Sequence, residues 1–254
     1  MHLGKPKLLI FIITFKASFR VKDVFKNIPF KKLKKYKTHV LISDDCSMDD
    51  TIDFANNIKK RNKNVLISEN KFNLGYGGNI KKCLNYALKK KYNYAVMIHG
   101  DGQYNPKYIP NLLSKFKNHN VSLSTGSRIL SGVKSVSKGG MPLYKMIGNI
   151  ILTKIFNFLM SQKFTDAHTG LWAYNMNYLK DKKFNLLTNG FNFDHEFRFQ
   201  NIIQNNLIKE IPIQTKYGDE RTQLHILYAL KFFLNSILFY FVKKNFLKLK
   251  KYKF

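Results

Sequence analysis

Short apolar runs alternate with amphipathic segments through the first half of the chain. Five runs have the length and composition of buried strands, namely residues 8–15, 40–43, 65–68, 95–98 and 123–126. Three segments between them place apolar side chains at helical spacing, namely residues 49–61, 79–91 and 106–117. This alternation predicts an α/β fold of βαβ units, with a mostly parallel sheet and helices on both of its faces.

The pattern changes after Gly126. Residues 129–141 are rich in Gly and Ser, which predicts a loop. The elements expected beyond it are a helix at 143–160, a strand at 170–174, a helix at 193–205 and a strand at 207–212. Because no linker or internal repeat interrupts this series, we expect one domain over residues 1–222 and an appendage over residues 223–254.

The net charge narrows the choice of partners. The chain has 254 residues, and 44 Lys and Arg against 15 Asp and Glu give a net charge of +29. Such a surface attracts nucleic acid, anionic lipid or phosphorylated substrates, although compositional drift toward lysine explains the excess equally well. The basic residues are scattered, and the sequence has no Cys/His finger or aromatic RNA-binding motif. A nucleic-acid-binding protein is therefore the less favoured alternative, and we expect no nucleic-acid partner.

Cysteine content and apolar segments bear on the compartment. Cys46 and Cys83 are too few for a disulfide framework, which is typical of a cytoplasmic protein with reduced thiols. The apolar N-terminal run lacks a small-residue cleavage site and predicts a strand instead of a signal peptide. No stretch reaches the roughly 20 apolar residues of a spanning helix, and the nearest is residues 226–242, before a Lys-rich tail. This end predicts either an interfacial helix with a polybasic anchor or a core helix with a solvated tail.

Polar clusters follow three of the predicted strands, at the edge where parallel sheets bind ligands. Asp44 and Asp45 follow the second strand, the sequence HGDGQ at 99–103 follows the fourth, and GSR at 126–128 follows the fifth. Acidic residues are scarce in this chain, so three carboxylates at strand ends indicate a site. The plainer alternative is that they cap helices and stabilise turns.

A glycine-rich turn, NLGYGGN at 73–79, opens the second predicted helix. Glycines at a helix N-terminus allow a ligand to approach the backbone, and the helix end favours anions. The spacing of the glycines departs from the G-x-G-x-x-G pattern, and the turn follows the third strand. We therefore do not expect a dinucleotide-binding fingerprint.

Together these stretches resemble the family 2 glycosyltransferases of the GT-A fold, and most closely the branch with polyprenyl-phosphate sugar transferases. The resemblance runs from about residue 11 to residue 222. The matching stretches are LISDDCSMDDT at 41–51, NLGYGGN at 73–79, MIHGDGQYNP at 97–106, GSR at 126–128, DAHTG at 166–170 and EIP at 210–212. The resemblance implies the nucleotide-diphospho-sugar transferase fold.

The resemblance also implies which residues bind the nucleotide sugar. Asp45 or its neighbour Asp44 matches the aspartate that holds the base and ribose. Gly75 lies in the glycine-rich turn, and Arg128 matches a cation near the diphosphate. The TFKAS sequence at 14–18 departs from the family's usual run at the first strand end, so the identity of the nucleotide stays open.

A divalent metal, Mg²⁺ or Mn²⁺, is implied by the HGDGQ sequence. Asp101 matches the catalytic, metal-associated acid, and Gln103 matches the Gln that follows it. His99 stands where the family's motif usually begins with Asp. An imidazole there either ligates the metal or hydrogen-bonds the nucleotide. The departure also leaves open a third alternative, that the protein is a degenerate family member without catalytic activity.

The second half of the chain matches the sugar or acceptor pocket of the family. Asp166, Thr169 and Gly170 belong to a motif that lines this pocket, and Arg221 is a candidate contact to an acceptor phosphate. Asp194 and Glu196 fall in the region where some members carry a general base.

We therefore expect an inverting glycosyltransferase that moves a hexosyl unit from a nucleotide-diphospho-sugar to a polyprenyl-phosphate-type lipid acceptor. It would work in glycan or cell-surface polysaccharide synthesis, on the anionic inner face of the cytoplasmic membrane. A divalent cation and an Arg offset the charge that develops on the leaving diphosphate. A phosphate acceptor is already anionic, whereas the alternative acceptor, a hydroxyl of a growing glycan, would need Asp194 or Glu196 as a base.

Overall fold

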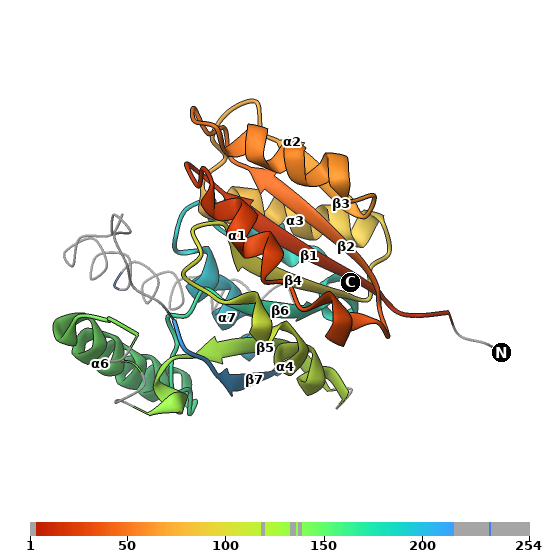
Figure 1. Ribbon diagram of the computed structural model, residues 1–254. Coiled ribbons are helices and arrows are strands. Elements are labelled where there is room, and N and C mark those ends of the chain that lie inside the picture. Colours follow the sequence, from red (N-terminus) through yellow and green to blue (C-terminus); the bar gives the residue numbers. More distant parts are fainter. Residues whose placement is uncertain (1–3, 118–119, 133–135, 137–138, 216–233, 235–254) are drawn as a thin grey trace.

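The computed structural model describes residues 4–117, 120–132, 136, 139–215 and 234. Within these residues, seven strands form one sheet in the order β3-β2-β1-β4-β6-β5-β7 (Figure 1). The strands are β1 (Lys7–Thr14), β2 (Lys37–Asp44), β3 (Val65–Glu69), β4 (Tyr94–His99), β5 (Val121–Ser127), β6 (Trp172–Asn175) and β7 (Leu207–Pro212). All neighbouring pairs are parallel except those of β6, which runs antiparallel to both β4 and β5.

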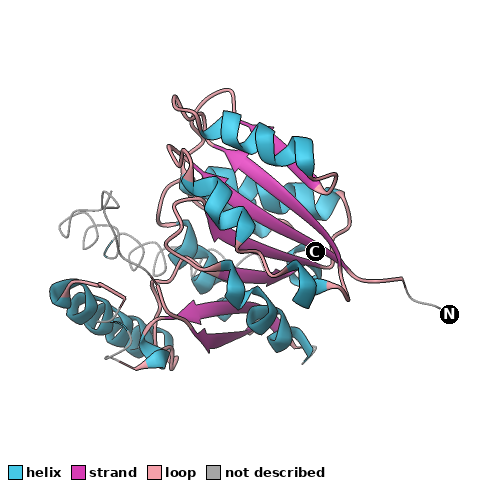
Figure 2. Cartoon of the chain, viewed as in Figure 1, coloured by secondary structure: helices cyan, strands magenta, loops and turns pink. Residues whose placement is uncertain are grey.

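The sheet is covered on both faces, as Figure 2 shows with helices on either side of the strands. The helices are α1 (Arg20–Lys26), α2 (Thr51–Arg61), α3 (Tyr76–Lys89), α4 (Ile109–Ser114), α6 (Leu143–Met160) and α7 (Phe193–Ile203). Short 3-10 helices are η1 (Phe30–Leu33), η2 (Pro106–Tyr108), η3 (Lys115–Lys117), η4 (Ile129–Ser131), η5 (Met176–Leu179) and η6 (Lys183–Leu186).

Strand β1 shows why the central strands read as unbroken apolar runs. Its side chains alternate between two hydrophobic cores: Leu9 and Phe11 pack on one face of the sheet, and Leu8 and Ile10 pack on the other. A strand buried on both faces needs apolar residues at every position. Helices α1, α2 and α4 supply the core of one face, and helices α3 and α7 supply the core of the other.

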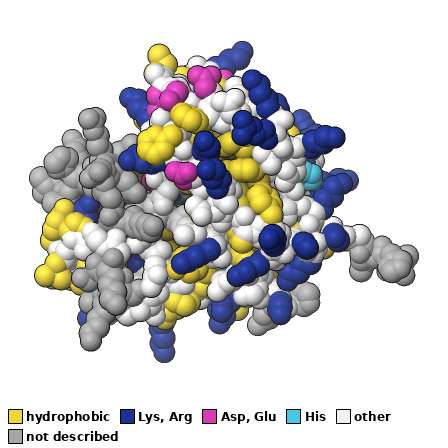
Figure 3. Space-filling view, viewed as in Figure 1, with side chains coloured by type: hydrophobic (Ala, Val, Ile, Leu, Met, Phe, Trp, Pro, Cys, Tyr) yellow, Lys and Arg dark blue, Asp and Glu magenta, His cyan; other side chains and the backbone are white. Residues whose placement is uncertain are grey.

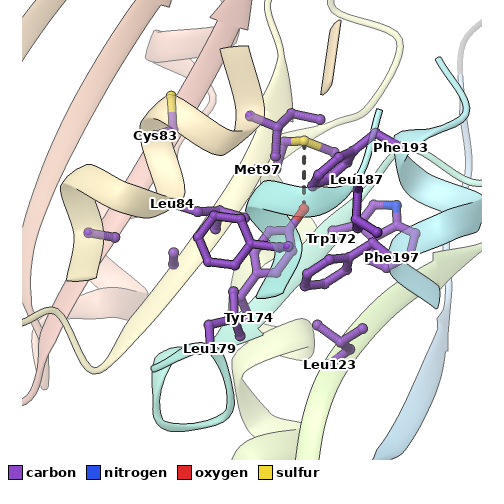
Figure 4. Close-up of a cluster of buried hydrophobic side chains, with 14 of the residues drawn as sticks. Cys83, Leu84, Met97, Leu123, Trp172, Tyr174, Leu179, Leu187, Phe193 and Phe197 are labelled. Carbon is purple, nitrogen blue, oxygen red and sulfur yellow. Dashed lines mark hydrogen bonds between the residues drawn. The ribbon is translucent and has the colours of Figure 1, made fainter. Parts of the chain in front are cut away.

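The core beneath α3 and α7 is rich in aromatic side chains, as Figure 4 shows. The rings of Trp172 and Phe197 lie 6.2 Å apart in an edge-to-face arrangement. The rings of Phe193 and Phe197 stack at 5.5 Å, and the Tyr174 hydroxyl lies 3.9 Å from the Met97 sulfur. These contacts hold β6 against α7 and so fix the start of α7, which carries two of the candidate site residues.

The expected elements are confirmed, with corrections at their ends. All seven predicted strands are present, and the loop expected after Gly126 contains the short helix η4. The segment 106–117 is helical throughout, as expected, but it is divided into the 3-10 helix η2, the α-helix α4 and the 3-10 helix η3. Helix α1 was not expected, since its seven residues are too few to show a clear helical period.

Helix α6 lies to one side of the sheet, beyond β5 and β7 (Figure 1). Among the described residues, it is the one helix whose length and apolar composition match those of a membrane-crossing helix. The expectation for residues 226–242 stays a prediction, because all of this segment except Leu234 lies outside the described residues. The boundary at residue 222 and Arg221 also lie outside them.

Candidate active site

The candidate site forms at the carboxyl edge of the sheet. Asp44 ends β2 and pairs in register with Thr14, the last residue of β1. His99 ends β4 and pairs with Ile13 of the same strand β1. Because β1, β2 and β4 are parallel, the residues that follow them meet at one edge, as the sequence predicts.

The two adjacent aspartates have different surroundings. Both oxygens of Asp44 are occupied, Oδ1 by the hydroxyls of Thr14 (2.8 Å) and Ser47 (2.6 Å) and Oδ2 by the Ser47 N–H (2.7 Å). Asp45 uses Oδ1 alone, which accepts from Asn70 Nδ2 and the Leu74 N–H, both at 2.8 Å. Among the described residues, Oδ2 of Asp45 has no partner. Both oxygens of Asp44 are therefore used within the protein, whereas one oxygen of Asp45 is not.

The glycines before α3 meet protein backbone. Gly75 has φ +78°, and a Cβ there would lie 2.7 Å from the carbonyl oxygen of Asn189. A Cβ on Gly77 would lie 2.6 Å from the carbonyl oxygen of Thr188, and the Gly78 N–H donates to that of Asn189 at 3.1 Å. These glycines seat the start of α3 on the loop before α7. Gly75 thus positions Tyr76, the first residue of α3, against that loop.

A hydrogen-bonded chain joins α3, β4 and α7. The Tyr76 hydroxyl donates to Oδ2 of Asp194 over 2.7 Å and lies 3.2 Å from Nε2 of His99. Gly170 packs on the same imidazole, because a Cβ at this position would lie 2.7 Å from Cε1 of His99. These contacts connect Asp194 through Tyr76 to His99, the first residue of the sequence HGDGQ, and Gly170 packs on the same imidazole.

Burial sets the protonation states of Asp194 and His99, the two ends of this hydrogen-bonded series. It raises the pKa of Asp194 to about 7, although the Tyr76 hydrogen bond and the charge of Arg198 act in the opposite direction. Burial lowers the pKa of His99, against the opposing charge of Asp101. His99 is therefore a neutral imidazole near pH 7, and Asp194 titrates close to neutrality.

The other candidate base, Glu196, accepts a hydrogen bond from the loop before α7. The side chain is 1% exposed, and its Oε2 accepts from the Thr188 N–H over 2.8 Å. Glu196 thereby holds the loop before α7. Of the two acids at the start of α7, only Asp194 contacts His99 through Tyr76.

Asp101 follows β4 in a tight turn. Oδ1 of Asp101 accepts from the Gln103 N–H over 2.9 Å, and Gly102 between them has φ +82°. The side chain of Asp101 is partly exposed at the edge of the sheet. Within the described residues no cluster of three or more His, Cys, Asp or Glu could hold a metal ion. The arrangement fits a site in which one carboxylate shares Mg²⁺ or Mn²⁺ with substrate phosphates and water.

Arg128 and Asp166 form a buried ion pair. The guanidinium is bidentate, with Nε 2.6 Å from Oδ2 and Nη2 2.9 Å from Oδ1 of Asp166. Burial alone would raise the pKa of Asp166, but the charge and hydrogen bonds of Arg128 outweigh it and hold that pKa well below its usual range. Much of the Arg128 guanidinium is therefore committed to a protein carboxylate.

Glu210 fixes the segment that contains Asp166. Oε2 of Glu210 accepts from the N–H (2.8 Å) and hydroxyl (3.0 Å) of Thr165, and Oε1 accepts from the Asp166 N–H (2.9 Å). Thr169 in the same segment accepts from Trp172 Nε1 through its carbonyl oxygen at 2.7 Å. No role was expected for Glu210. Its place in the matching stretch EIP is the available sequence signal, but its partner Asp166 lies 44 positions away.

Two more buried polar features were not foreseen. Arg198 is fully buried between the rings of Phe164 (4.7 Å) and Trp172 (4.8 Å), and its three nitrogens have no hydrogen-bond partner among the described residues. His168 Nδ1 and His195 Nε2 lie 2.7 Å apart, and burial lowers the pKa of His168 to about 4. Arg198 is one helical turn after Asp194, which is the sequence signal that could have paired the two residues.

Comparison with known proteins identifies the class. The sequence model of Glycosyl transferase family 2 matches residues 10–182. An uncharacterized protein of Methanocaldococcus jannaschii, MJ0544, is 30% identical over 198 residues, 75% of this chain and 82% of that protein. The undecaprenyl-phosphate mannosyltransferase of Micrococcus luteus is 24% identical over 178 residues, 70% of this chain and 71% of that protein.

Solved structures agree in fold. Glucosyl-3-phosphoglycerate synthase from Mycobacterium tuberculosis, in complex with Mn²⁺, UDP and glucosyl-3-phosphoglycerate, has a TM-score of 0.64 at 12% identity and covers 94% of this chain and 79% of its own. A mannosyltransferase from Pyrobaculum calidifontis with GDP-Man and Mn²⁺ has a TM-score of 0.60 at 12% identity, covering 92% and 65%. These neighbours are GT-A glycosyltransferases. The chain belongs to glycosyl transferase family 2, and it is a nucleotide-sugar glycosyltransferase of the GT-A fold.

Proposed function

We propose that the enzyme is an inverting transferase that moves a hexosyl unit from a nucleotide-diphospho-sugar to a polyprenyl-phosphate-type acceptor. The observation that carries this proposal is the carboxyl edge of the sheet, where Asp45 follows β2 and Asp101 lies in the turn after β4. The acid expected at the nucleotide and the acid expected at the diphosphate thus follow the two strands that flank β1.

The donor is proposed to bind along the edge from β2 to β5. The second oxygen of Asp45 is directed to the ribose or base, because its first oxygen already holds the Leu74 N–H. The buried ion pair of Arg128 and Asp166 is proposed to line the part of the pocket that holds the diphosphate and the sugar. The pair is neutral overall, and the carboxylate fixes the orientation of the guanidinium. Thr169 and Gly170 follow this pair in the chain and continue the same wall of the pocket.

Asp101 is proposed to hold a divalent cation, with Gln103 beside it. The cation would offset the negative charge that develops on the leaving diphosphate. Nε2 of His99 contacts the Tyr76 hydroxyl and lies against Gly170, so we assign His99 to positioning instead of metal binding. The neighbours that contain Mn²⁺ with UDP or GDP-Man support a metal in this fold.

The lipid acceptor is supported by the 24% identical relative from Micrococcus luteus, whose name states undecaprenyl phosphate. The net charge of +29 favours an anionic acceptor and an anionic membrane surface, and Figure 3 shows Lys and Arg side chains spread over the face in view. We place the enzyme on the inner face of the cytoplasmic membrane, with the basic segment 223–254 and Arg221 as further candidate contacts to phosphate.

A hydroxyl acceptor is the second candidate, and the pKa of Asp194 near 7 favours it. A sugar hydroxyl must lose its proton as it attacks, and a base of this pKa suits the step at neutral pH. A phosphate acceptor is already anionic, so it does not need Asp194 for this purpose.

The test is a transfer assay with the purified chain. UDP- and GDP-sugars are supplied with Mg²⁺ or Mn²⁺, together with either a polyprenyl phosphate or a glycan that offers a hydroxyl. The proposal expects transfer to the polyprenyl phosphate, loss of transfer with EDTA, and little effect of Asp194→Asn on that transfer. Transfer to the glycan alone, abolished by Asp194→Asn, would establish the second candidate instead.

A further inference from the structure

Helix α6 carries apolar side chains on two opposite sides. One side is buried and packs on the protein through Met146, Phe156 and Met160, with Thr153 between them. The other side is exposed. It consists of Leu143, Tyr144, Ile147, Ile151, Ile155 and Phe158, which we call the α6 face.

The α6 face is a continuous stripe. At 100° per residue, its six side chains fall within about a third of the helix circumference, and they extend over roughly 22 Å of helix length. Phe158 is 86% exposed, Leu143 65% and Ile151 51%. A helix on the surface of a water-soluble domain normally directs polar side chains outward, so an exposed apolar stripe indicates a binding surface.

The inward side of α6 shows that the helix lies along the protein and does not leave it. Nδ2 of Asn157 donates to the Phe164 carbonyl (2.7 Å), and its Oδ1 accepts from the Phe164 N–H (2.9 Å). Nδ2 of Asn149 lies 3.2 Å from Oδ1 of Asp166, within the site already described. A helix that crossed a bilayer could not keep these polar contacts with the domain. The exposed stripe therefore contacts any binding partner along the length of the helix.

We propose that the α6 face docks on an anionic lipid bilayer, with its apolar side chains inserted at the level of the headgroups. The charge of the segment selects this occupant. Helix α6 contains no Asp or Glu, and the exposed Lys154 lies on the same side of the helix as the stripe. Lys163 follows the helix, and the whole chain carries +29. Basic residues beside an apolar stripe are typical of helices that bind anionic membrane surfaces.

Docking through α6 would place the active site beside the membrane. The contact of Asn149 with Asp166 connects the inner side of the helix to the Arg128–Asp166 pair. A lipid-linked phosphate could then reach the site without leaving the bilayer. This consequence rests on the proposed function, whereas the docking surface itself does not.

Fluorescence tests the position of the α6 face directly. The chain has one tryptophan, Trp172, which is fully buried, so its emission provides a constant background. A Phe158→Trp variant adds a reporter in the stripe. We expect its emission to shift to the blue when vesicles of phosphatidylcholine and phosphatidylglycerol are added to the full chain. Lipids brominated near the headgroup end of the acyl chain should quench it.

Three results would overturn the proposal. If the new tryptophan already emits in the blue without vesicles and does not change, another segment of the chain covers the face. If the shift depends on protein concentration and tracks a dimer in sedimentation, a second copy covers it. Vesicle binding with no change at Phe158→Trp would assign membrane attachment to another part of the chain.

A pair of matched variants tests how much the apolar side chains of the α6 face contribute to membrane binding. Ile147→Gln with Ile151→Gln removes apolar surface from the centre of the stripe without adding charge. The control, Leu186→Gln with Leu207→Gln, changes two exposed leucines elsewhere on the surface. We expect the α6 variant to partition at least about tenfold more weakly into the vesicles and the control to match the parent. Equal partitioning of all three proteins would overturn the proposal.

Separate readouts distinguish this inference from the proposed acceptor. If the chain transfers sugar to no polyprenyl phosphate in detergent but Phe158→Trp still inserts, the proposed acceptor fails and the docking face stands. If the α6 variant binds vesicles as the parent does while transfer to polyprenyl phosphate is intact, the docking face fails and the acceptor stands.

Discussion

The Tyr76 hydroxyl donates a hydrogen bond of 2.7 Å to Asp194, although the two residues are 118 positions apart in the chain. Tyr76 is the first residue of α3, and Gly75 before it allows the close approach to Asn189 that sets its position. The same hydroxyl lies beside His99, so one phenol contacts both the end of β4 and the start of α7. The glycine-rich turn thus serves the site indirectly, by orienting a tyrosine.

Replacing this tyrosine should change the titration of Asp194. The hydrogen bond stabilises the charged carboxylate, so Tyr76→Phe removes that stabilisation and raises the pKa of Asp194 above its present value of about 7. A hydrogen bond to a charged group contributes roughly 1.5–3 kcal/mol, which corresponds to about one to two pKa units. The pH dependence of transfer to a hydroxyl acceptor should show its acidic limb displaced upward. Tyr86→Phe on the same helix is the control, and an identical shift in both variants would contradict the assignment.

The raised pKa of Asp194 also predicts how stability depends on pH. In the unfolded chain this carboxyl titrates near 3.8, and in the folded protein near 7. Between these values the folded state binds more protons, so the stabilisation from this group is fully present below the unfolded pKa and is lost as the pH rises through 7. Asp194→Asn removes the charge, and it should increase the free energy of unfolding at pH 8 by up to about 4 kcal/mol. Urea unfolding at pH 5 and pH 8 measures this; a gain that is equal at both pH values would contradict the prediction.

Gly170 gives a steric test of the same cluster. A Cβ at this position would lie 2.7 Å from Cε1 and 2.8 Å from Nε2 of His99, so Gly170→Ala must displace the imidazole from Tyr76. Overpacking of this kind costs about 1–3 kcal/mol, and we expect a lower melting temperature together with lower transfer activity. Gly148→Ala on α6 is the matched control, because a Cβ there meets nothing within 4 Å. If Gly170→Ala has the same melting temperature and transfer activity as this control, the position of His99 does not matter for either property.

The sequence predicts the sheet well because its strands are buried on both faces. A run such as residues 8–15 needs no partner to be recognised, since continuous apolar content over a short length already indicates a central strand. The carboxyl edge follows from the same reasoning, since Asp44 at the end of β2 and His99 at the end of β4 both pair with the last residues of β1. Local pattern therefore carries both the fold and the edge at which the site forms.

What the sequence does not predict depends on hydrogen bonds between distant residues. The choice between Asp44 and Asp45 rests on Thr14 and Asn70, which lie 30 and 25 positions away. The pairing of Glu210 with Thr165 spans 45 positions. Such pairs leave no period or spacing in the chain, so only the folded arrangement shows which carboxylate has both oxygens occupied by protein groups and which has one.

Asp101 is the residue whose replacement tests the chemistry most sharply. Its Oδ1 accepts the Gln103 N–H, and the Asn of Asp101→Asn can accept the same hydrogen bond, so the turn should survive. The variant loses the anionic ligand, which matters most when the diphosphate gains charge in the transition state. We expect turnover to fall by about 100-fold, equivalent to ~2.7 kcal/mol, with a much smaller change in nucleotide-sugar affinity. Titration of Mn²⁺ in the transfer assay, with affinity measured by calorimetry, separates the two effects. His99→Ala should lower turnover less and leave the Mn²⁺ dependence unchanged, because the imidazole faces Tyr76. An active Asp101→Asn enzyme with the parent's Mn²⁺ dependence would place the metal elsewhere.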